Sequence, residues 1–493
     1  MDSVTLITFI VYLVGMLVIG IIAFRLTNNL SDYVLGGRNL GGSVAALSAG
    51  ASDMSSWLLL GLPGAMYAGG MNQIWLAIGL AVGAYLNWQF VAKRLRTYTE
   101  VAKDSITIPD FLENRFRDQS RILRVISALV ILIFFTFYTS AGLVGGAILF
   151  EQSFGIEYQS ALWIGAIVII SYTFLGGFLA VSWTDFFQGI LMFLALIIVP
   201  IVAINAAGGW NEVVNQVGRI DPGFLNAFTD TTAIGIISLL AWGLGYFGQP
   251  HIITRFMAVK STKEIPKARF IGMSWMVFAL YGSIFTGFAG IAYFADTPLD
   301  NEETVFIAFT QELFNPWVAG ILLAAILSAI MSTIDSQLLV SSSAVAEDFY
   351  KGIIRKNASQ KELVWIGRIA VIIIAIIAIL IAQNPESQVL DLVEYAWAGF
   401  GAAFGPIIIL SLFWKRTTVG GAIAGMVVGA LTVIVWEQLE GGIFDLYEIV
   451  PGFALGAVAI IIVSLIFGTP TNPSKVVKEE FNEAIENESR GLK

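Results

Sequence analysis

Residues 45–64 read AALSAGASDMSSWLLLGLPG, a stretch long and apolar enough to cross a bilayer that nevertheless holds an acid, Asp53. Asp53 is the only acidic side chain between Asp32 and Glu100. An ionisable group at membrane depth is costly, so it is by default a functional-site hypothesis. The same stretch is rich in Gly, Ser and Pro, which let a helix break and leave its freed backbone groups to hydroxyls or an ion. The sequence therefore predicts a binding site built from a broken transmembrane helix.

The composition of the chain is that of a polytopic membrane protein. Its 493 residues are 57% hydrophobic and 13% charged, with a mean hydropathy of +0.79, whereas soluble domains carry roughly 25% charged residues. Residues 1–24 are treated as a true helix and not a cleavable signal peptide, because the apolar run is too long and its basic flank follows it. Apolar runs of about 20 residues, the length that spans ~30 Å of hydrocarbon, predict about thirteen spans, near 4–24, 43–68, 73–92, 122–150, 159–178, 184–204, 231–254, 270–294, 317–345, 365–382, 389–413, 419–437 and 449–467.

The placement of basic residues predicts the orientation of these spans. With the N-terminus outside, the inner loops and the tail hold 26 of the 27 Lys and Arg residues, and only Arg219 lies outside. This is a strong positive-inside signal. We therefore expect an odd number of crossings in a cell membrane, one transmembrane domain over residues 1–468, and a charged cytoplasmic tail over residues 469–493. The acidic residues of the outer loops and the tail are interpreted as solvated surface.

A second interrupted segment lies about 200 residues after the first. Residues 241–255 read AWGLGYFGQPHIITR, an apolar run broken by three glycines and a proline. Two such segments at matching positions of two halves indicate the binding site of a secondary transporter. Counting from the second span gives five plus five helices, with core repeats at about 41–204 and 231–413. Because five is odd, the second half must be inserted upside down relative to the first.

A third segment, residues 322–338, carries hydroxyl side chains with a helical period. Ala329, Ser332, Thr333 and Ser336 fall on one face of a helix with 3.6 residues per turn. Their hydroxyls, with carbonyls of an unwound neighbouring segment, would give an oxygen-only sodium site. The alternative is that these small residues only permit close helix packing or bond to their own helix.

Several functions are excluded by residues that the chain lacks. It has no cysteine and a single histidine, His251, which excludes thiolate and multi-histidine metal sites and bis-histidine haem. No G-x-x-x-x-G-K-[ST] motif is present, so nothing indicates nucleotide hydrolysis. Uphill transport would then require an ion gradient.

Four motifs in order, residues 48–55, 176–185, 245–255 and 329–333, resemble the sodium:solute symporter family. The resemblance runs from about Leu6 to the end of the last span. It implies an all-α, LeuT-type fold, a 5+5 inverted-repeat core with one extra N-terminal and two extra C-terminal helices. It also implies that sodium is held by main-chain oxygens of Ala51 and Met54, the Ala329 carbonyl, and the hydroxyls of Ser332 and Thr333.

The resemblance further implies a proline pocket lined by aromatic residues. A pyrrolidine ring packs on aromatic faces while its carboxylate points to a helix N-terminus; the alternative for these aromatics is ordinary helix packing. Asp335 is interpreted as pairing with a basic residue at the inner mouth, or as tuning sodium binding. Ser56 departs from the glycine common in relatives and either adds a hydrogen bond or stiffens the break. The expected substrate-site residues are Asp53, Ser55, Ser56, Tyr138, Trp242, Gly245 and Tyr246, and the expected coupling or gating residues are Asp185, Arg38 and Pro250.

The function expected from this resemblance is inward symport of L-proline with Na⁺ by alternating access. The expected partners are L-proline, Na⁺ and the lipid bilayer, without a cofactor, nucleic acid, enzymatic activity or obligatory protein partner. Two alternatives stay open: another small amino acid or compatible solute carried by the same ion cycle, and a transporter-like membrane sensor. The short tail disfavours the sensor because it has no room for a signalling module.

Overall fold

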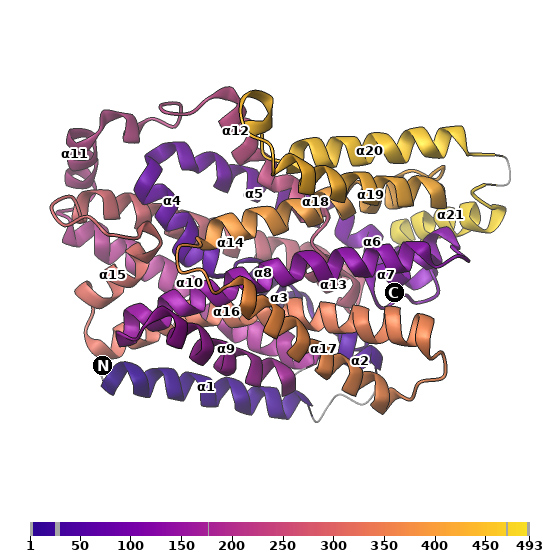
Figure 1. Cartoon of the computed structure of the whole chain (residues 1–493), viewed down its shortest axis with the longest axis horizontal. Helices are drawn as coiled ribbons and strands as arrows, with labels where there is room; N and C mark the ends of the chain where they lie inside the picture. The colour runs from indigo at the N-terminus through magenta and orange to yellow at the C-terminus, as the bar shows by residue number, and fades with distance from the viewer. Residues whose placement is uncertain (1–2, 25–29, 176, 470–471, 491–493) are drawn as a thin grey trace.

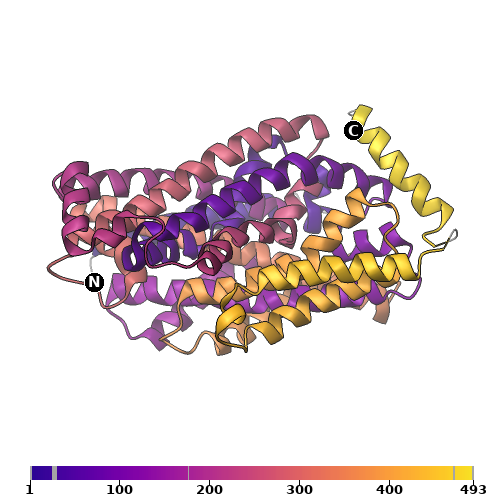
Figure 2. The same ribbon diagram turned by 90° about the horizontal axis from the view of Figure 1, so that it is seen from above.

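A computed structural model describes residues 3–24, 30–175, 177–469 and 472–490. Arg25 of the predicted inner loops, Gly176 of the second motif and residues 491–493 of the tail lie outside these ranges. Within them the chain is helical, and extended pairing is limited to isolated bridges such as Leu40 with Val259. Most helices run along the longest axis of the molecule, and the two chain ends lie toward opposite ends of it (Figures 1 and 2).

Every one of the thirteen predicted spans coincides with helix in the described part of the chain. The elements are α1 (Ser3–Phe24); α3 (Gly42–Asp53), η2 (Trp57–Gly61) and α4 (Leu62–Gly69); α5 (Ile74–Leu86), η4 (Asn87–Val91) and α6 (Ala92–Val101); α8 (Ile122–Phe154); α9 (Tyr158–Leu175); α10 (Phe178–Ala206); α12 (Ala233–Ala241), η6 (Trp242–Phe247) and α13 (Pro250–Ala258); α14 (Ile265–Tyr293); α16 (Pro316–Ser343) and η9 (Ala344–Ile354); α17 (Gln360–Ile381); α18 (Val389–Phe413); α19 (Val419–Trp436); and α20 (Ile449–Ile466).

Shorter helices lie between the spans and after them. They are α2 (Leu30–Leu35), η1 (Gly36–Arg38), η3 (Gly70–Gln73), α7 (Ile108–Phe116), α11 (Trp210–Ile220), η5 (Pro222–Leu225), η7 (Thr262–Glu264), η8 (Glu302–Thr304), α15 (Val305–Leu313), η10 (Gly442–Asp445) and α21 (Lys475–Arg490).

Fewer than thirteen individual helices are long and apolar enough to cross a membrane. Among the described residues there are ten, or eleven when the bent pair Ala233–Phe247 and Pro250–Ala258 counts as one span. The two remaining predicted spans are accounted for locally. Residues 57–101 form one apolar helical run that turns at Gly70, where φ is +70°, and the apolar part of α9, Tyr158–Ser171, is shorter than a full span.

Both predicted helix breaks are present, and each has a local cause. The helix α3 ends at Asp53, and Met54 takes non-helical angles (φ −82°, ψ 78°) before the chain resumes in a π-helical turn. In the second break Gln249 is extended (φ −75°, ψ 107°) and Pro250 opens α13. A proline pushes the preceding residue out of the helical region and fits the first helical turn. The two parts of this span meet at a bend of 41°.

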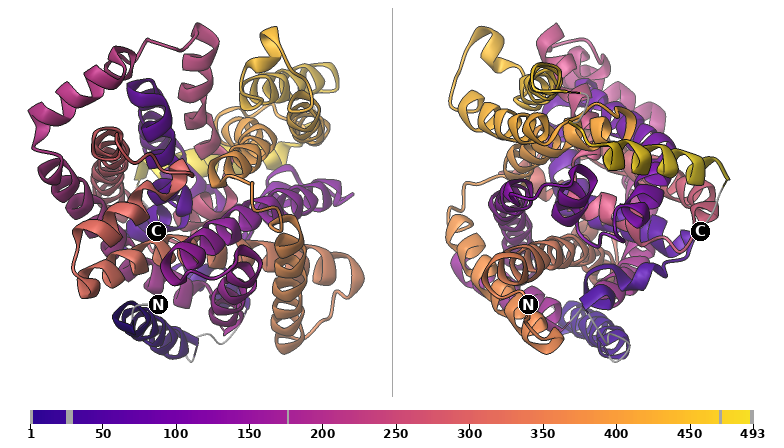
Figure 3. Two further views of the ribbon diagram at one scale, coloured as in Figure 1. Left: turned by 60° about the vertical axis from the view of Figure 1, so that its left-hand side comes forward. Right: turned by 90° about the vertical axis from the view of Figure 1, so that its right-hand side faces the viewer.

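The broken spans lie in the middle of the molecule, and the helices outside the predicted ten-helix core (α1, α19 and α20) lie at its edges. In the views of Figures 1 and 3, α1 lies at one edge and α19 with α20 at the opposite one. Side chains of α1 such as Ile10, Val11 and Val14 are exposed, whereas those of α16 from Leu322 to Leu339 are buried. Exposed aliphatic residues on the outer helices suit a lipid environment.

The tail differs from the solvated segment that the sequence predicts. Residues Lys475–Arg490 form α21, an amphipathic helix that packs on α6, with Phe481 and Ala484 buried. The carboxylate of Glu488 pairs with Arg94, and that of Glu480 pairs with Arg117. The apolar face of α21 is the reason, because its packing on α6 brings these acids next to Arg94 and Arg117.

Candidate functional site

The residues of the predicted ion site come together where α3 meets α16. The Ser332 hydroxyl donates to the carbonyl oxygen of Ala51 at 2.8 Å, and the Thr333 hydroxyl donates to the same oxygen at 3.5 Å. Ser332 Oγ also lies 3.2 Å from the Ala329 carbonyl oxygen. All four residues are buried, and their oxygens are the hard, uncharged ligands that alkali cations take from broken helices. Met54 lies three residues after Ala51, at the break itself.

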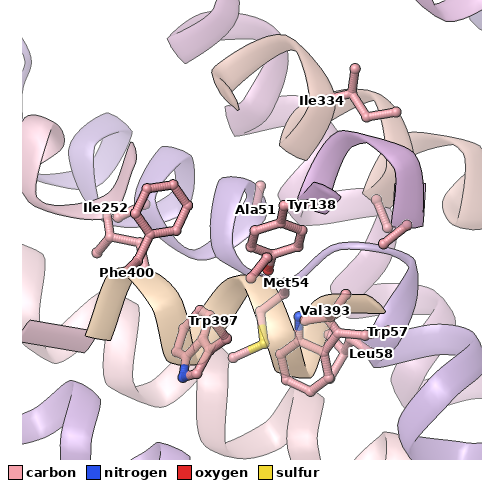
Figure 4. Close-up of a cluster of buried hydrophobic side chains, with 14 of the residues drawn as sticks. Ala51, Met54, Trp57, Leu58, Tyr138, Ile252, Ile334, Val393, Trp397 and Phe400 are labelled. Atoms are coloured by element: carbon pink, nitrogen blue, oxygen red, sulfur yellow. The ribbon is translucent and has the colours of Figure 1, made fainter. Parts of the chain in front are cut away.

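Aromatic side chains surround the first break (Figure 4). The Trp397 indole N–H donates to the Trp242 carbonyl at 2.7 Å, and the two indole rings stack with centroids 6.3 Å apart. The Tyr246 ring meets Trp397 edge-on at 5.1 Å. In Figure 4 the Met54 side chain lies between Trp397 and Trp57, and the Tyr138 ring lies beside Ala51 and Met54. The predicted pocket residues Trp242 and Tyr246 therefore cluster with Trp397, whereas Tyr138 is linked to Tyr246 through Asp53, to which both hydroxyls donate. Trp57 and Trp397 were not predicted, because nothing local distinguishes them from packing aromatics.

Gly245 has a specific steric role in this cluster. A Cβ atom added at Gly245 would lie 1.9 Å from the indole nitrogen of Trp397. Glycine therefore lets η6 and α18 approach closely enough for the Trp397–Trp242 hydrogen bond to form. Gly245 was predicted as a pocket residue. Its close contact with Trp397 explains why a residue without a side chain is needed at this position.

Asp53 is engaged through both its backbone and its side chain. Its carbonyl oxygen accepts from the Trp57 indole N–H at 3.1 Å and from the Tyr138 hydroxyl at 3.4 Å. Its carboxylate Oδ2 accepts from the Tyr246 hydroxyl at 2.6 Å. Asp53 thus links the break in the first half of the chain to η6 in the second half.

The two serines after the break have different surroundings. The backbone N–H of Ser55 donates to the Asp53 carbonyl at 3.0 Å, and Ser55 Oγ lies 3.4 Å from the backbone nitrogen of Trp57. The Ser56 hydroxyl is buried and has no partner among the described residues. Its backbone is in the ordinary helical region (φ −52°, ψ −27°). Of the two effects considered for Ser56, an added hydrogen bond is therefore not observed.

Asp185 lies in a buried ion pair that the sequence did not reveal. Its Oδ2 accepts from the Ser48 hydroxyl at 2.7 Å and from Arg255 Nη2 at 3.2 Å. Arg255 Nη2 also donates to the Ser336 hydroxyl at 2.6 Å. The Ser336 hydroxyl oxygen in turn lies 2.9 Å from that of Ser52. Both charged side chains have no exposed surface. Arg255 lies within α13 and not in a loop. The signal available in the sequence was Asp185, an acid in an apolar segment that contains no base.

This pairing corrects the interpretation of Asp335. Among the described residues Asp335 forms no ion pair; its Oδ1 accepts from the Ser336 hydroxyl at 3.3 Å and its Oδ2 has no partner. The expected pairing with a base at the inner mouth is absent because the nearby guanidinium of Arg255 is taken by Asp185. Pro250 lies at the first turn of α13, as expected for a residue that shapes the break.

Arg38 connects three segments of the chain by hydrogen bonds. Its guanidinium pairs with Asp104 at 2.8 Å and donates to the Thr99 hydroxyl at 3.1 Å. It also donates to the carbonyl oxygens of Met257 at 2.8 Å and Ser105 at 2.7 Å. Burial lowers the pKa of Arg38, and the Asp104 charge opposes that shift. The residue therefore joins the entry to α3, the end of α13 and the segment after α6.

Glu303 makes a corresponding connection at the other end of the molecule. Its carboxylate accepts the backbone N–H groups of Val389 at 3.0 Å and Leu390 at 3.1 Å, at the start of α18. Unpaired N–H groups at a helix start favour an anion. Burial nevertheless raises the pKa of Glu303 to about 7.

The fold and this geometry together define a membrane transporter whose central site is formed by two broken helices. The chain matches the model of the sodium:solute symporter family over residues 33–429, and it belongs to that family. It is 54% identical over 485 residues to a sodium/proline symporter of Escherichia coli, covering 97% of this chain and 96% of that one. It is 55% identical over 471 residues to the high-affinity proline transporter PutP of Bacillus subtilis, covering 95% and 98%.

Solved structures show the same fold at low sequence identity. A Na⁺-coupled sialic acid symporter, in a substrate-bound outward-open state, matches with a TM-score of 0.79 and 21% identity over 95% of this chain and 98% of that chain. MhsT in complex with L-phenylalanine matches with a TM-score of 0.54 and 14% identity over 86% and 97%. The expected LeuT-type fold is thereby confirmed.

Proposed function

We propose that this protein couples inward flow of Na⁺ to uptake of L-proline. The observation that carries the proposal is the meeting of Ala51, Ala329, Ser332 and Thr333 oxygens beside the aromatic cluster at the first break. The family and the names of the relatives, which are sodium/proline symporters and proline transporters, support both solutes.

In this proposal sodium binds before or together with proline and joins the two halves of the site. Oxygens of Ala51 and Met54 on the broken helix and of Ser332 and Thr333 on α16 would replace water around the ion. Holding α3 against α16 fixes the break, and with it the Asp53 carbonyl on which Tyr138 and Trp57 converge. By reciprocity, proline must raise the affinity for sodium by the same factor.

The proline ring would pack against the aromatic faces of Tyr138, Trp242, Tyr246 and Trp397. Its charged groups would find helix ends and carbonyl oxygens freed by the two breaks. In this assignment Ser55, Ser56 and Gly245 shape the pocket, whereas Arg38, Asp185 and Pro250 act on opening and coupling.

The proposed orientation has the N-terminus outside and the C-terminus, with α21, in the cytoplasm of a cell membrane. Arg94 and Arg117 pair with Glu488 and Glu480 of α21, so these bases lie on the same side of the membrane as the tail in this orientation, in agreement with the positive-inside rule. The transporter domain is proposed to cover residues 1–468, with repeats at about 41–204 and 231–413. Each Na⁺ entering a negative interior would add about 2.3 kcal/mol per 100 mV to the driving force.

Uptake of radiolabelled proline into proteoliposomes, with and without an inward sodium gradient, tests the proposal. The unmodified protein should accumulate proline only with the gradient, and Thr333→Ala should shift the sodium dependence to higher concentration. Thr432→Ala is a matched control, because its hydroxyl bonds only to its own helix at Val428 in the peripheral α19. Uptake indifferent to sodium would reject the coupling, and uptake of another solute with proline inert would reject only the substrate.

A further inference from the structure

A large cavity, here called the outer cavity, lies where α18 and α20 begin and α19 ends. Its volume is about 410 Å³, within the range of roughly 300–1,000 Å³ that is usual for ligand sites. Ser238 of α12 also lines it. In Figure 1, α12 lies next to the segment between α19 and α20, and it contacts both η10 and α20. In the proposed orientation the cavity faces the outside of the cell.

Five carboxylates line the outer cavity, and none of them is paired with a base among the described residues. They are Asp391, Glu394, Glu437, Asp445 and Glu448. Glu437 and Asp445 accept only local hydrogen bonds, from Gln438 and from the Gly441 backbone N–H. The single base assigned to the outer side, Arg219, pairs with Glu212 elsewhere. The cavity therefore carries a concentrated negative charge without a counter-charge from the protein.

Glu448 is the acid at this cavity that most requires a partner. Asp391, Glu437 and Asp445 are exposed and solvated, whereas the exposed fraction of Glu448 is only 9%. It lines the cavity, and within the described part of the chain no other residue donates a hydrogen bond to its carboxylate. A buried carboxylate without a partner is costly. This side chain therefore indicates that a positively charged group occupies the cavity.

Aromatic side chains make up much of the remaining lining: Tyr395, Trp436, Phe444 and Tyr447. The donors of two of them are already engaged. The Tyr447 hydroxyl donates to the Glu394 carbonyl at 2.7 Å, and the Trp436 indole N–H donates to the Leu446 carbonyl at 2.9 Å. These two residues therefore offer ring surface to an occupant and no free donor. Aromatic rings attract organic ammonium ions through cation–π interactions, and carboxylates beside them add charge attraction.

Other kinds of occupant fit this lining less well. The described residues contain no group of three acids able to hold a metal ion, which argues against a chelated divalent cation, since such ions take six or more oxygens. A solute that carries a carboxylate, such as proline, would meet five like charges. A hydrated alkali cation would leave the aromatic surface unused. An organic cation uses both the charge and the rings.

The outer cavity is connected to the aromatic cluster at the second break. Ser238 belongs to α12, the first part of the bent span, and its hydroxyl accepts the Tyr447 backbone N–H at 2.9 Å. The Tyr447 ring packs against Trp242 with centroids 5.5 Å apart. An occupant would therefore touch α12 on one side and the starts of α18 and α20 on the other. It would oppose any separation of these elements.

We propose that the outer cavity binds one organic monocation of the ammonium type, and that the bound cation slows transport by holding α12 against α18 and α20. Glu394 and Glu448 supply the charge, and Tyr395 and Trp436 supply ring surface. The effect on transport rests on the proposed symport, whereas the binding does not.

Equilibrium dialysis of radiolabelled phenyltrimethylammonium against the purified full-length protein tests the site, at pH 8 in a low-salt potassium buffer without sodium or proline. We expect saturable binding of one cation per chain, weakened by added salt. Glu448→Gln should weaken binding about fivefold or more, because one unit charge at ~4 Å has that effect even in water. Asp300→Asn is the matched control, since Asp300 is an exposed acid of a predicted outer loop that does not line the cavity. If Glu448→Gln does not fold, Glu394→Gln takes its place.

Competition experiments identify the chemical class of the occupant. The neutral analogue 2-phenylpropan-2-ol should not displace the probe, and NaCl should displace it no better than KCl. Binding that does not saturate, equal affinity in Glu448→Gln and Asp300→Asn, or displacement by the neutral analogue as strong as that by unlabelled probe would overturn the site. Displacement by Na⁺ at the concentration at which unlabelled probe acts would overturn the assignment to an organic cation.

Proteoliposome uptake tests the effect on transport. Phenyltrimethylammonium added outside should lower the initial rate of sodium-driven proline uptake by the unmodified protein and by Asp300→Asn, and should lower it less for Glu448→Gln. Binding without such inhibition would overturn the effect on transport. Failure of the proposed symport is recognised separately, because the unmodified protein would then show no sodium-driven proline uptake even without the probe.

Discussion

Replacing Arg255 by methionine should destabilise the protein strongly, because it leaves the Asp185 carboxylate buried without a counter-charge. Both side chains are fully buried, and Arg255 also donates to the hydroxyls of Ser48 and Ser336. Breaking a buried ion pair by removing one partner costs about 3–5 kcal/mol. The folding equilibrium should therefore fall by roughly 100- to 4,000-fold, at 1.4 kcal/mol for each factor of ten.

The double variant Asp185→Leu with Arg255→Met should recover most of this loss. Replacing both members of a buried pair by apolar residues is often neutral or stabilising. Here the Ser48 hydroxyl loses both partners, whereas Ser336 still bonds to the Ser332 carbonyl at 2.8 Å. We expect a residual cost of about 1 kcal/mol for the lost hydrogen bonds.

Denaturant unfolding of the purified proteins in mild detergent measures these differences, and proteoliposome uptake measures coupling. A single variant Arg255→Met that unfolds no more readily than the double variant would refute the argument from an uncompensated charge. Sodium-driven uptake by the folded double variant, with an unchanged sodium dependence, would show that the pair serves structure and not coupling.

Four further predictions concern separate parts of the molecule. Gly245→Ala should displace Trp397, lower stability by about 1–3 kcal/mol, the usual cost of overpacking, and weaken proline binding; adding Trp397→Phe should relieve part of the loss of binding in a titration. Thr333→Ala should raise the sodium concentration for half-maximal uptake several-fold while leaving uptake at saturating sodium largely intact, as sodium titrations will report. The pKa of Glu303 is raised from 4.5 to about 7, so between these pH values the folded protein binds more protons than the unfolded chain. The stabilising contribution of protonated Glu303 is therefore lost as pH rises through 7. Glu303→Gln should remove this pH dependence of stability when melting temperatures are compared at pH 5 and pH 8. Phe481→Ala should detach α21, lower stability by about 3 kcal/mol, the low end of the cost of truncating a buried Phe, and increase proteolysis of the tail. Unchanged protease resistance would contradict the packing of α21.

The helix breaks were predictable because their causes are local. Gln249 precedes a proline, and Asp53 ends a helix within a segment rich in Gly and Ser. The hydroxyl face of α16 was predictable for the same reason, since residues 332 and 333 follow residue 329 at the helical period. The convergence of Ser332 on the Ala51 carbonyl, 281 positions away, was expected only through the family resemblance.

Hydropathy, Gly and Pro placement and the distribution of Lys and Arg determined by themselves that this chain is a polytopic transporter with two discontinuous spans, because each of these signals is carried by neighbouring residues. Only the tertiary structure decided which charges meet. Arg255 lies with Asp185, 70 positions earlier, and not with Asp335. The physical reason is that buried charge pairing depends on distances across helices, which no periodic pattern along a single helix encodes.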